Sequence, residues 1–304
     1  MSSLLRPTIV VLGPSGQIGW ELMRTLAPLG EVIGLSRGNA DHPVDLARPE
    51  TIREALQAIR PAVIVNAAAY TAVDRAESER DLAMAVNATA PRVMAEEARY
   101  LGALLLHYST DYVFDGHGSI PYVETDTTRP LNVYGLSKRV GEEAIQESAV
   151  SYVILRTSWI YGLRGHNFLR TIMRVAQERD DLRIVSDQTG SPTWSRLVAE
   201  ATAPIVARWL HSRGVGFPAS GVYHLSCAGQ TNWCEFARAI VDHMRSRAPL
   251  RARAVQAITT AEYPTPAARP SYSVLSNAKI HQHHGIALPA WSTALTLCLE
   301  ALGT

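Results

Sequence analysis

The sequence TIVVLGPSGQIG, residues 8–19, sets the architecture of this 304-residue chain. Its first five residues are apolar and mostly β-branched, which predicts a short buried strand. Gly13, Gly16 and Gly19 follow as a tight turn, and apolar periodicity over residues 17–26 predicts a helix. Glycines let a backbone turn sharply and approach a pyrophosphate, which the N–H groups at the helix N-terminus can bind. The stretch therefore predicts a dinucleotide-binding turn.

The same strand-and-helix pattern recurs along the chain. Apolar runs separated by amphipathic segments favour a parallel sheet that helices cover on both faces. The sequence therefore predicts an α/β fold with a doubly wound parallel sheet of the Rossmann type. The expected strands are 8–12, 31–36, 62–68, 103–110, 151–158 and 222–226, and the expected helices are 17–26, 49–59, 89–100, the segment carrying YGLSK, 167–178, 196–211, 233–247 and 291–302.

A smaller substrate domain is expected in the second half, because the alternation loosens after about residue 164. The strand expected at 222–226 has the apolar character of the main sheet and should rejoin it, which makes the smaller domain discontinuous. We assign residues 1–165 and about 196–225 to the dinucleotide-binding domain. We assign about 166–195 and 226–304 to the smaller C-terminal domain.

Composition excludes several classes of protein. Lys and Arg number 29 against 28 Asp and Glu, and no basic run is present, so a nucleic-acid partner is not expected. Cys227, Cys234 and Cys298 lack the spacing of a metal site, which favours reduced structural thiols. The apolar run near the N-terminus is too short to span a membrane and is not followed by a cleavage site. We expect a cytoplasmic protein with no membrane partner.

The end of the second expected strand bears on the choice of cofactor. An acidic residue there would accept a hydrogen bond from an adenosine ribose 2′-hydroxyl, but this chain has Ser36 and Arg37. An arginine can pair with a 2′-phosphate, which a carboxylate would repel. We therefore expect NADPH to be preferred. NADH stays possible, since an arginine at position 37 is equally consistent with stacking on adenine or with a solvated charge at the surface.

The sequence NVYGLSK, residues 132–138, places Tyr134 and Lys138 four residues apart, so on a helix they share one face. A free phenol has a pKa of about 10, and a neighbouring ammonium favours its ionised form. The strand ending HYSTDYVFDG brings Thr110 to the same carboxyl edge of the sheet, where Thr110 can hydrogen-bond to a substrate oxygen. His107, within that apolar strand, is expected to be a core histidine.

An ordered set of motifs extends this interpretation: GPSGQIG, NAAAYTAVDRAE, VNATAP, HYSTDYVFDG, PLNVYGLSK and LRTSWIYG. Together they resemble the extended short-chain dehydrogenase/reductase superfamily. With DQTGSPT (187–193) and RPSYSVLSNAKI (269–280), the chain is similar almost end to end to the dTDP-4-dehydrorhamnose reductase family. The resemblance implies an NADPH-dependent reduction of the C4 ketone of dTDP-6-deoxy-L-lyxo-4-hexulose to dTDP-L-rhamnose. It also implies a place in lipopolysaccharide or other cell-surface polysaccharide biosynthesis, and a smaller domain that binds the nucleotide sugar.

The family's functional residues carry over position by position. The resemblance implies that Tyr134 is the acid, that Lys138 lowers its pKa and holds the nicotinamide ribose, and that Thr110 orients the substrate. The implied substrate contacts are Thr110, Asp111, Trp159 and Arg269, although Asp111 suits the cap of a turn equally well. Besides Arg37, the expected cofactor-binding residues are Gly13, Gly16, Gln17, Ile18, Gly19, Asp45, Leu46, Ala68, Ala69, Tyr70, Thr71, Tyr134 and Lys138.

One departure from the family concerns metal binding and assembly. Some members are dimers joined by a divalent ion that glutamates hold. Glu21 stands at one such position, but Arg196 occupies another. Because a cation there would oppose a metal ion, we predict no metal site. A homodimer stays open.

Two alternative functions stay open on the residues alone. The first is a reductase of a related nucleotide 4-keto-6-deoxysugar, for example one that yields dTDP-6-deoxy-L-talose. The second is a non-catalytic subunit similar to the regulatory subunit of methionine adenosyltransferase, which shares the superfamily fold. The joint presence of Thr110, Tyr134 and Lys138 favours an enzyme.

Overall fold

A computed structural model describes residues 6–212, 220–245 and 249–302. Its centre is a six-stranded sheet with the strand order β10-β5-β4-β3-β1-β2, in which every neighbouring pair is parallel. The predicted doubly wound α/β fold is therefore confirmed. The strands are β1 (Thr8–Leu12), β2 (Glu31–Leu35), β3 (Val63–Asn66), β4 (Leu104–Thr110), β5 (Ser151–Thr157) and β10 (Gly221–His224).

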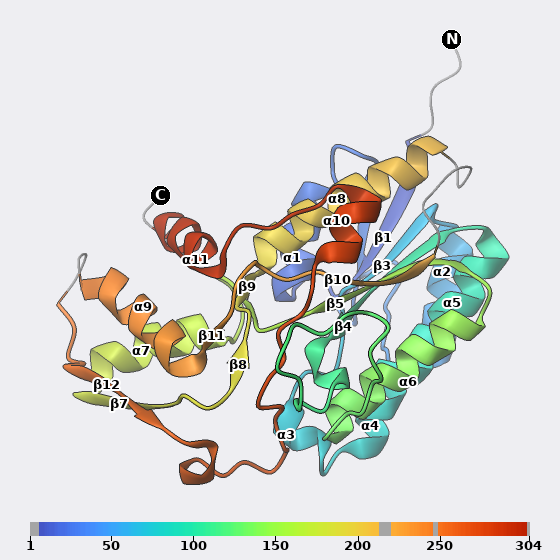
Figure 1. Ribbon diagram of the computed structural model, residues 1–304. Helices are drawn as coiled ribbons and strands as arrows, with labels where there is room; N and C mark the ends of the chain where they lie inside the picture. Colours follow the sequence, from blue (N-terminus) through green and yellow to red (C-terminus); the bar gives the residue numbers. More distant parts are fainter. Residues whose placement is uncertain (1–5, 213–219, 246–248, 303–304) are drawn as a thin grey trace.

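Helices cover both faces of this sheet (Figure 1). Alternate residues of a strand point to opposite faces, so Ile9 and Val11 pack on one side and Val10 and Leu12 on the other. The first face packs against α1 (Gln17–Thr25) and α8 (Ser195–Ser212), and the second against α2 (Pro49–Ile59), α5 (Ala90–Leu101) and α6 (Val133–Glu147). Because both faces are buried, the strands are continuous apolar runs.

A second core lies beyond the carboxyl edge of the sheet (Figure 1). It is built by α7 (Phe168–Glu178), α9 (Trp233–Arg245) and α11 (Trp291–Glu300), with a parallel pair of strands, β7 (Asp181–Val185) and β12 (Ala254–Ile258). The expected helix 233–247 runs into residues 246–248, which lie outside the described residues. Between these elements the chain returns to the main sheet as β10, which pairs with β5 as expected. The domain boundaries stay a prediction.

Near its end the chain returns once more to the core of the main sheet, which is called the first core below. Helix α10 (Ala278–His284) places Ile280 in the core that α1 and α8 share, and Ile286 follows it there. The chain thus alternates between the two cores several times.

The remaining elements are short. They are α3 (Val73–Ala76), α4 (Arg80–Met84), the π-helical turn η1 (Ala85–Thr89), the 3₁₀ turns η2 (Asp111–Val113) and η3 (Thr260–Glu262), and the two-residue strands β6 (Ile160–Tyr161), β8 (Thr189–Gly190), β9 (Thr193–Trp194) and β11 (Thr231–Asn232). Helix α6 approaches η1 closely, since a Cβ at Gly141 would lie 2.1 Å from the carbonyl oxygen of Asn87. Within the described ranges, no helix has the length and apolar character needed to cross a bilayer.

Candidate active site

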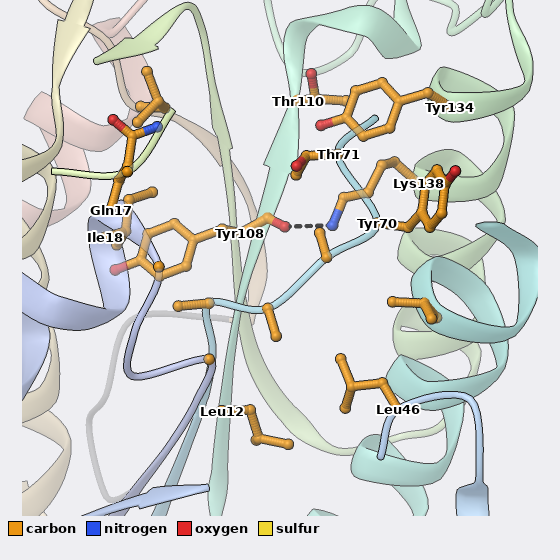
Figure 2. Close-up of a pocket in the computed structure, with 18 of the residues that line it drawn as sticks. Leu12, Gln17, Ile18, Leu46, Tyr70, Thr71, Tyr108, Thr110, Tyr134 and Lys138 are labelled. Atoms are coloured by element: carbon orange, nitrogen blue, oxygen red, sulfur yellow. Dashed lines mark hydrogen bonds between the residues drawn. The ribbon is translucent and has the colours of Figure 1, made fainter. Parts of the chain in front are cut away.

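A cavity of about 920 Å³ opens at the carboxyl edge of the sheet. The strand order changes direction there, since β2 and β3 flank β1 on opposite sides and the chain then continues outward through β4 and β5. Such a switch point is where open α/β sheets bind ligands. The cavity walls come from the turn after β1, the ends of β2, β3, β4 and β5, and helix α6. Figure 2 shows Thr110 and Tyr134 at one end of it and Leu12 and Leu46 at the other.

The glycine turn fits a bound pyrophosphate. Gly13 has a φ of +80°, and a Cβ on it would lie 2.9 Å from the Cβ of Ala68. A Cβ on Gly19 would lie 1.9 Å from the carbonyl oxygen of Gly13, so this glycine lets α1 pack on the turn and is not among the cavity-lining residues. Helix α1 has no side-chain cap at Gly16, so its first N–H groups stay available to an anion.

The other expected cofactor residues lie along the same cavity. Gly13, Gly16, Gln17 and Ile18 line it beside the turn, Arg37, Asp45 and Leu46 line it beyond β2, and Ala68, Ala69, Tyr70 and Thr71 line it beyond β3. Arg37 makes no ion pair with any residue that the structure describes, which leaves its guanidinium available to a phosphate. Gln17 is held from the second core, because its Oε1 accepts a hydrogen bond from Asn167 Nδ2 at 2.9 Å.

Tyr134 and Thr110 meet at the far end of the cavity. Burial raises the pKa of Tyr134 to about 12, while the neighbouring hydroxyl of Thr110 opposes the rise and the charge of Asp111 adds to it. The phenol is therefore protonated at neutral pH. Burial dominates the pKa of Tyr134 in the protein without a cofactor, and the lowering of this pKa by Lys138 stays a prediction.

Thr110, and not Asp111, caps the turn that follows β4. The Thr110 hydroxyl accepts the N–H of Tyr112 at 3.2 Å and donates to Asp111 Oδ1 at 3.1 Å. Asp111 lines the cavity, is 2% exposed and also accepts a hydrogen bond from Ser158 Oγ at 3.0 Å. Burial raises the pKa of Asp111 to about 6. The carboxyl group therefore does not cap the turn, and the hydroxyl groups of Thr110 and Ser158 hold it beside the cavity.

Lys138 completes the group from one turn along α6. Its Nζ donates to the carbonyl oxygen of Tyr108 at 2.7 Å, as the dashed line in Figure 2 shows. The same nitrogen lies 3.1 Å from Nε2 of His107. Burial lowers the pKa of Lys138 to about 8, and the charge of Glu142 opposes that shift. The structure therefore brings Thr110, Tyr134 and Lys138 to one cavity end, and His107 is a core histidine as expected, although it contacts Lys138.

Trp159 also lines the cavity, with a positive φ of 47°. Its ring stacks on Trp233 with 3.5 Å between ring centroids, and Trp233 lines the cavity as well. The stack needs Gly190, because a Cβ there would lie 2.4 Å from the Trp159 ring. Trp233 is not among the residues that the sequence singled out for the site. It starts a helix of the second core, so its place at the cavity depends on how the two cores meet.

Arg269 is the one expected substrate contact that does not line the cavity. Its guanidinium pairs with Asp74 at 2.8 Å and also contacts Thr265, so it lies beside the cavity wall near Tyr112. Its role in substrate binding stays a prediction.

Sequence reasoning missed two residues that donate hydrogen bonds to side chains of the site. Ser158 donates to Asp111, and Asn167 donates to Gln17. Ser158 directly follows β5, and a polar residue at a strand's carboxyl end was a signal that could have found it. Asn167 caps α7 and gave no such signal.

Glu21 and Arg196 form an ion pair of 3.5 Å between α1 and α8. Over the ranges that the structure describes, no three His, Cys, Asp or Glu side chains are grouped so that they could hold a metal ion. The guanidinium of Arg196 therefore lies beside Glu21, the glutamate that the family resemblance relates to metal binding.

Comparisons with known proteins identify the family of the chain. The model of the family described as RmlD substrate binding domain matches residues 7–304. The chain is 48% identical to dTDP-4-dehydrorhamnose reductase of Burkholderia thailandensis, covering 97% of this chain and 98% of the relative, and 43% identical to that of Escherichia coli K12 with the same coverage. The crystal structure of dTDP-4-dehydrorhamnose reductase from Bacillus anthracis in complex with NADP superposes with a TM-score of 0.87 at 32% identity, covering 97% of this chain and 99% of that one. The chain belongs to the dTDP-4-dehydrorhamnose reductase family.

Proposed function

We propose that this chain reduces the C4 ketone of dTDP-6-deoxy-L-lyxo-4-hexulose with NADPH to give dTDP-L-rhamnose. One observation carries the proposal: a single cavity is lined by an open glycine turn and also, toward one end, by Tyr134, Thr110 and Lys138. The relatives named above are reductases of this kind, and the Bacillus anthracis enzyme was crystallised with NADP.

The nicotinamide cofactor, when bound, supplies the hydride that the carbonyl carbon accepts. Tyr134 donates its phenolic proton to the developing alkoxide, and its raised pKa ensures that the proton is present at neutral pH. Thr110, which the Tyr112 N–H holds in place, then turns its O–H from Asp111 to the phenolate. This hydrogen bond stabilises the charge that proton transfer leaves behind.

Lys138 has two roles in the proposal. Its Nζ uses one N–H on the Tyr108 carbonyl, and a further N–H can point into the cavity toward the hydroxyls of a nicotinamide ribose. When it is protonated, its charge also stabilises the Tyr134 phenolate.

The cofactor would lie along the cavity from Arg37 to Tyr134, with the pyrophosphate against the glycine turn. Arg37 supports NADPH over NADH, since it is free to pair with a 2′-phosphate. NADH would bind the same residues without that ion pair.

The second core supplies the remaining wall and supports a domain that binds the nucleotide sugar. Asp111 and Trp159 are suited to contact the sugar, and Arg269 could reach a diphosphate if it leaves Asp74. We further propose that the product supplies rhamnose for a cell-surface polysaccharide. The buried free thiols suit a reducing compartment, which favours the cytoplasm.

The test is to follow NADPH oxidation by absorbance with enzymatically prepared substrate and to identify the sugar product by NMR. The proposal expects dTDP-L-rhamnose. A dTDP-6-deoxy-L-talose product would change the stereochemical assignment, and tight NADPH binding without turnover would favour a non-catalytic subunit.

A further inference from the structure

Lys138 contacts a buried histidine that the proposed mechanism does not use. His107 is fully buried on β4, and its Nε2 lies 3.1 Å from Lys138 Nζ. Its Nδ1 lies 2.9 Å from the side-chain nitrogen of Asn66 on β3, which pairs with His107 in the sheet register. Asn66, His107 and Lys138 therefore form a continuous hydrogen-bonded chain that leads from the sheet interior to the cavity wall.

The protons that Asn66, His107 and Lys138 carry can be arranged along this series of hydrogen bonds in two ways. Burial and the nearby Lys138 hold the pKa of His107 well below its ordinary value, so the imidazole is neutral and carries one N–H. In the first arrangement the Asn66 amide nitrogen donates to Nδ1 of His107. Nε2 then carries the proton and donates to Lys138 Nζ, which must be an unprotonated amine to accept it. With the Asn66 amide turned over, Nδ1 donates to the amide oxygen and Nε2 accepts from a Lys138 ammonium. The two arrangements differ by one proton on Lys138.

Backbone contacts at the cavity wall favour the first arrangement. The Asn66 amide oxygen accepts the N–H of Ala68 at 3.2 Å, and Ala68 lines the cavity. Turning the amide over breaks this bond, so the ammonium form of Lys138 needs a compensating contact. A hydroxyl that accepts the remaining N–H of Lys138 from the cavity would supply it.

The other ionisable groups around Lys138 are neutral or already paired. They come from several elements: Tyr134 and Glu142 on α6, Arg156 on β5 and Tyr70 after β3. Arg156 binds Glu142 with a contact of 2.6 Å, and both are almost completely buried. The pKa values of both phenols are raised, by burial and by the hydrogen bond of Tyr70 to Glu79, so neither carries charge at neutral pH.

We propose that His107 is a positioning residue for Lys138: together with Asn66 it fixes Nζ at the cavity wall, and its tautomer follows the charge on Lys138. Its function is to keep both the amine and the ammonium hydrogen-bonded. The inference deepens the proposed function and rests on it only for the measurement of NADPH affinity.

The sequence allows a direct measurement, because Lys138 and Lys279 are its only lysines. Lysine isotope-labelled at the ε-carbon gives two NMR signals, and a Lys279→Arg variant identifies the signal of Lys138. The Lys138 signal of the wild-type protein should titrate with a midpoint of about pH 8. A midpoint above about 10, near the ordinary value for lysine, would overturn the proposal without any variant.

Three variants test the role of His107. His107→Phe removes the donor to the amine and the acceptor of the ammonium. Because the hydrogen bond from the charged group is the stronger of the two, the midpoint should fall by roughly one pH unit. His107→Gln keeps an amide oxygen near the position of Nε2 and should restore the wild-type midpoint to within about half a unit. Asn66→Asp can only accept from Nδ1, which makes Nε2 an acceptor, so the midpoint should rise.

Folding is checked by circular dichroism and thermal unfolding, and NADPH affinity measured against pH should follow the same midpoints without turnover. An unchanged midpoint in folded His107→Phe would refute the proposal. If His107→Phe does not fold, a midpoint that fails to rise in Asn66→Asp refutes it equally. Because the NMR titration needs no substrate, these outcomes are separate from failure of the proposed reductase activity.

Discussion

Replacing Tyr134 by phenylalanine removes one oxygen atom and with it the proposed proton donor. The ring should keep its place, because it packs edge to face on Tyr112 with 5.6 Å between centroids and Thr110 stays capped to the Tyr112 N–H. Cofactor binding should therefore survive. Removal of a general acid lowers turnover by roughly 10² to 10⁴, which corresponds to an increase of about 2.7 to 5.4 kcal/mol in the activation barrier.

The assay is steady-state NADPH oxidation, with fluorescence titration of NADPH as a separate measure of binding. Tyr122→Phe is the matched control, because its hydroxyl donates to Asp115 and accepts from the Gly118 N–H, away from the cavity. It should lose stability by about 1 kcal/mol and keep its turnover number. Near-normal turnover of Tyr134→Phe would remove the phenol from the mechanism, and equal losses in both variants would point to a structural effect.

Three further changes probe the cofactor, the core and the buried carboxyl group. Arg37→Ala should raise the KM for NADPH by roughly tenfold to a hundredfold and leave the KM for NADH almost unchanged; equal effects on both would refute the 2′-phosphate assignment. Glu142→Gln leaves Arg156 buried and unpaired and should reduce the free energy of unfolding in urea by about 3 to 5 kcal/mol, whereas Glu143→Gln at an exposed ion pair should change it by less than about 1 kcal/mol. Because the pKa of Asp111 is raised in the folded state, its ionisation costs stability above about pH 6, and the cost disappears as the pH falls to about 4. Asp111→Asn should therefore gain stability over the wild type at pH 7 and lose this gain below about pH 4; a difference that does not vary with pH would contradict the assignment.

The main sheet could be predicted from sequence because its strands are buried on both faces. Residues 104–110, for example, are all buried, so the apolar run and the strand coincide. The elements that were missed, such as α3 and the π-helical turn η1, are only four or five residues long and show no usable periodicity. They depend on tertiary contacts, such as the close approach of α6 to η1, which a local pattern does not contain.

Within the site, local spacing predicted some contacts and not others. Tyr134 and Lys138 share a helix face, so their joint position followed from one turn of helix. The contact of Lys138 with His107 joins residues 31 positions apart, and it depends on how α6 packs on β4. The choice between Thr110 and Asp111 as the cap depended on backbone angles, because both residue types cap turns and only the extended backbone of Thr110 identifies it.

The alternation of the chain between its two cores has a consequence for unfolding. After β5 the chain builds α7, returns through α8 and β10, leaves again for α9, and comes back as α10 before it ends in α11. No single cut in the sequence separates the two cores, so neither can be expressed as a continuous fragment with its packing intact. Unfolding of one core would disrupt segments that connect directly to the other core. We therefore expect a single cooperative unfolding transition in calorimetry.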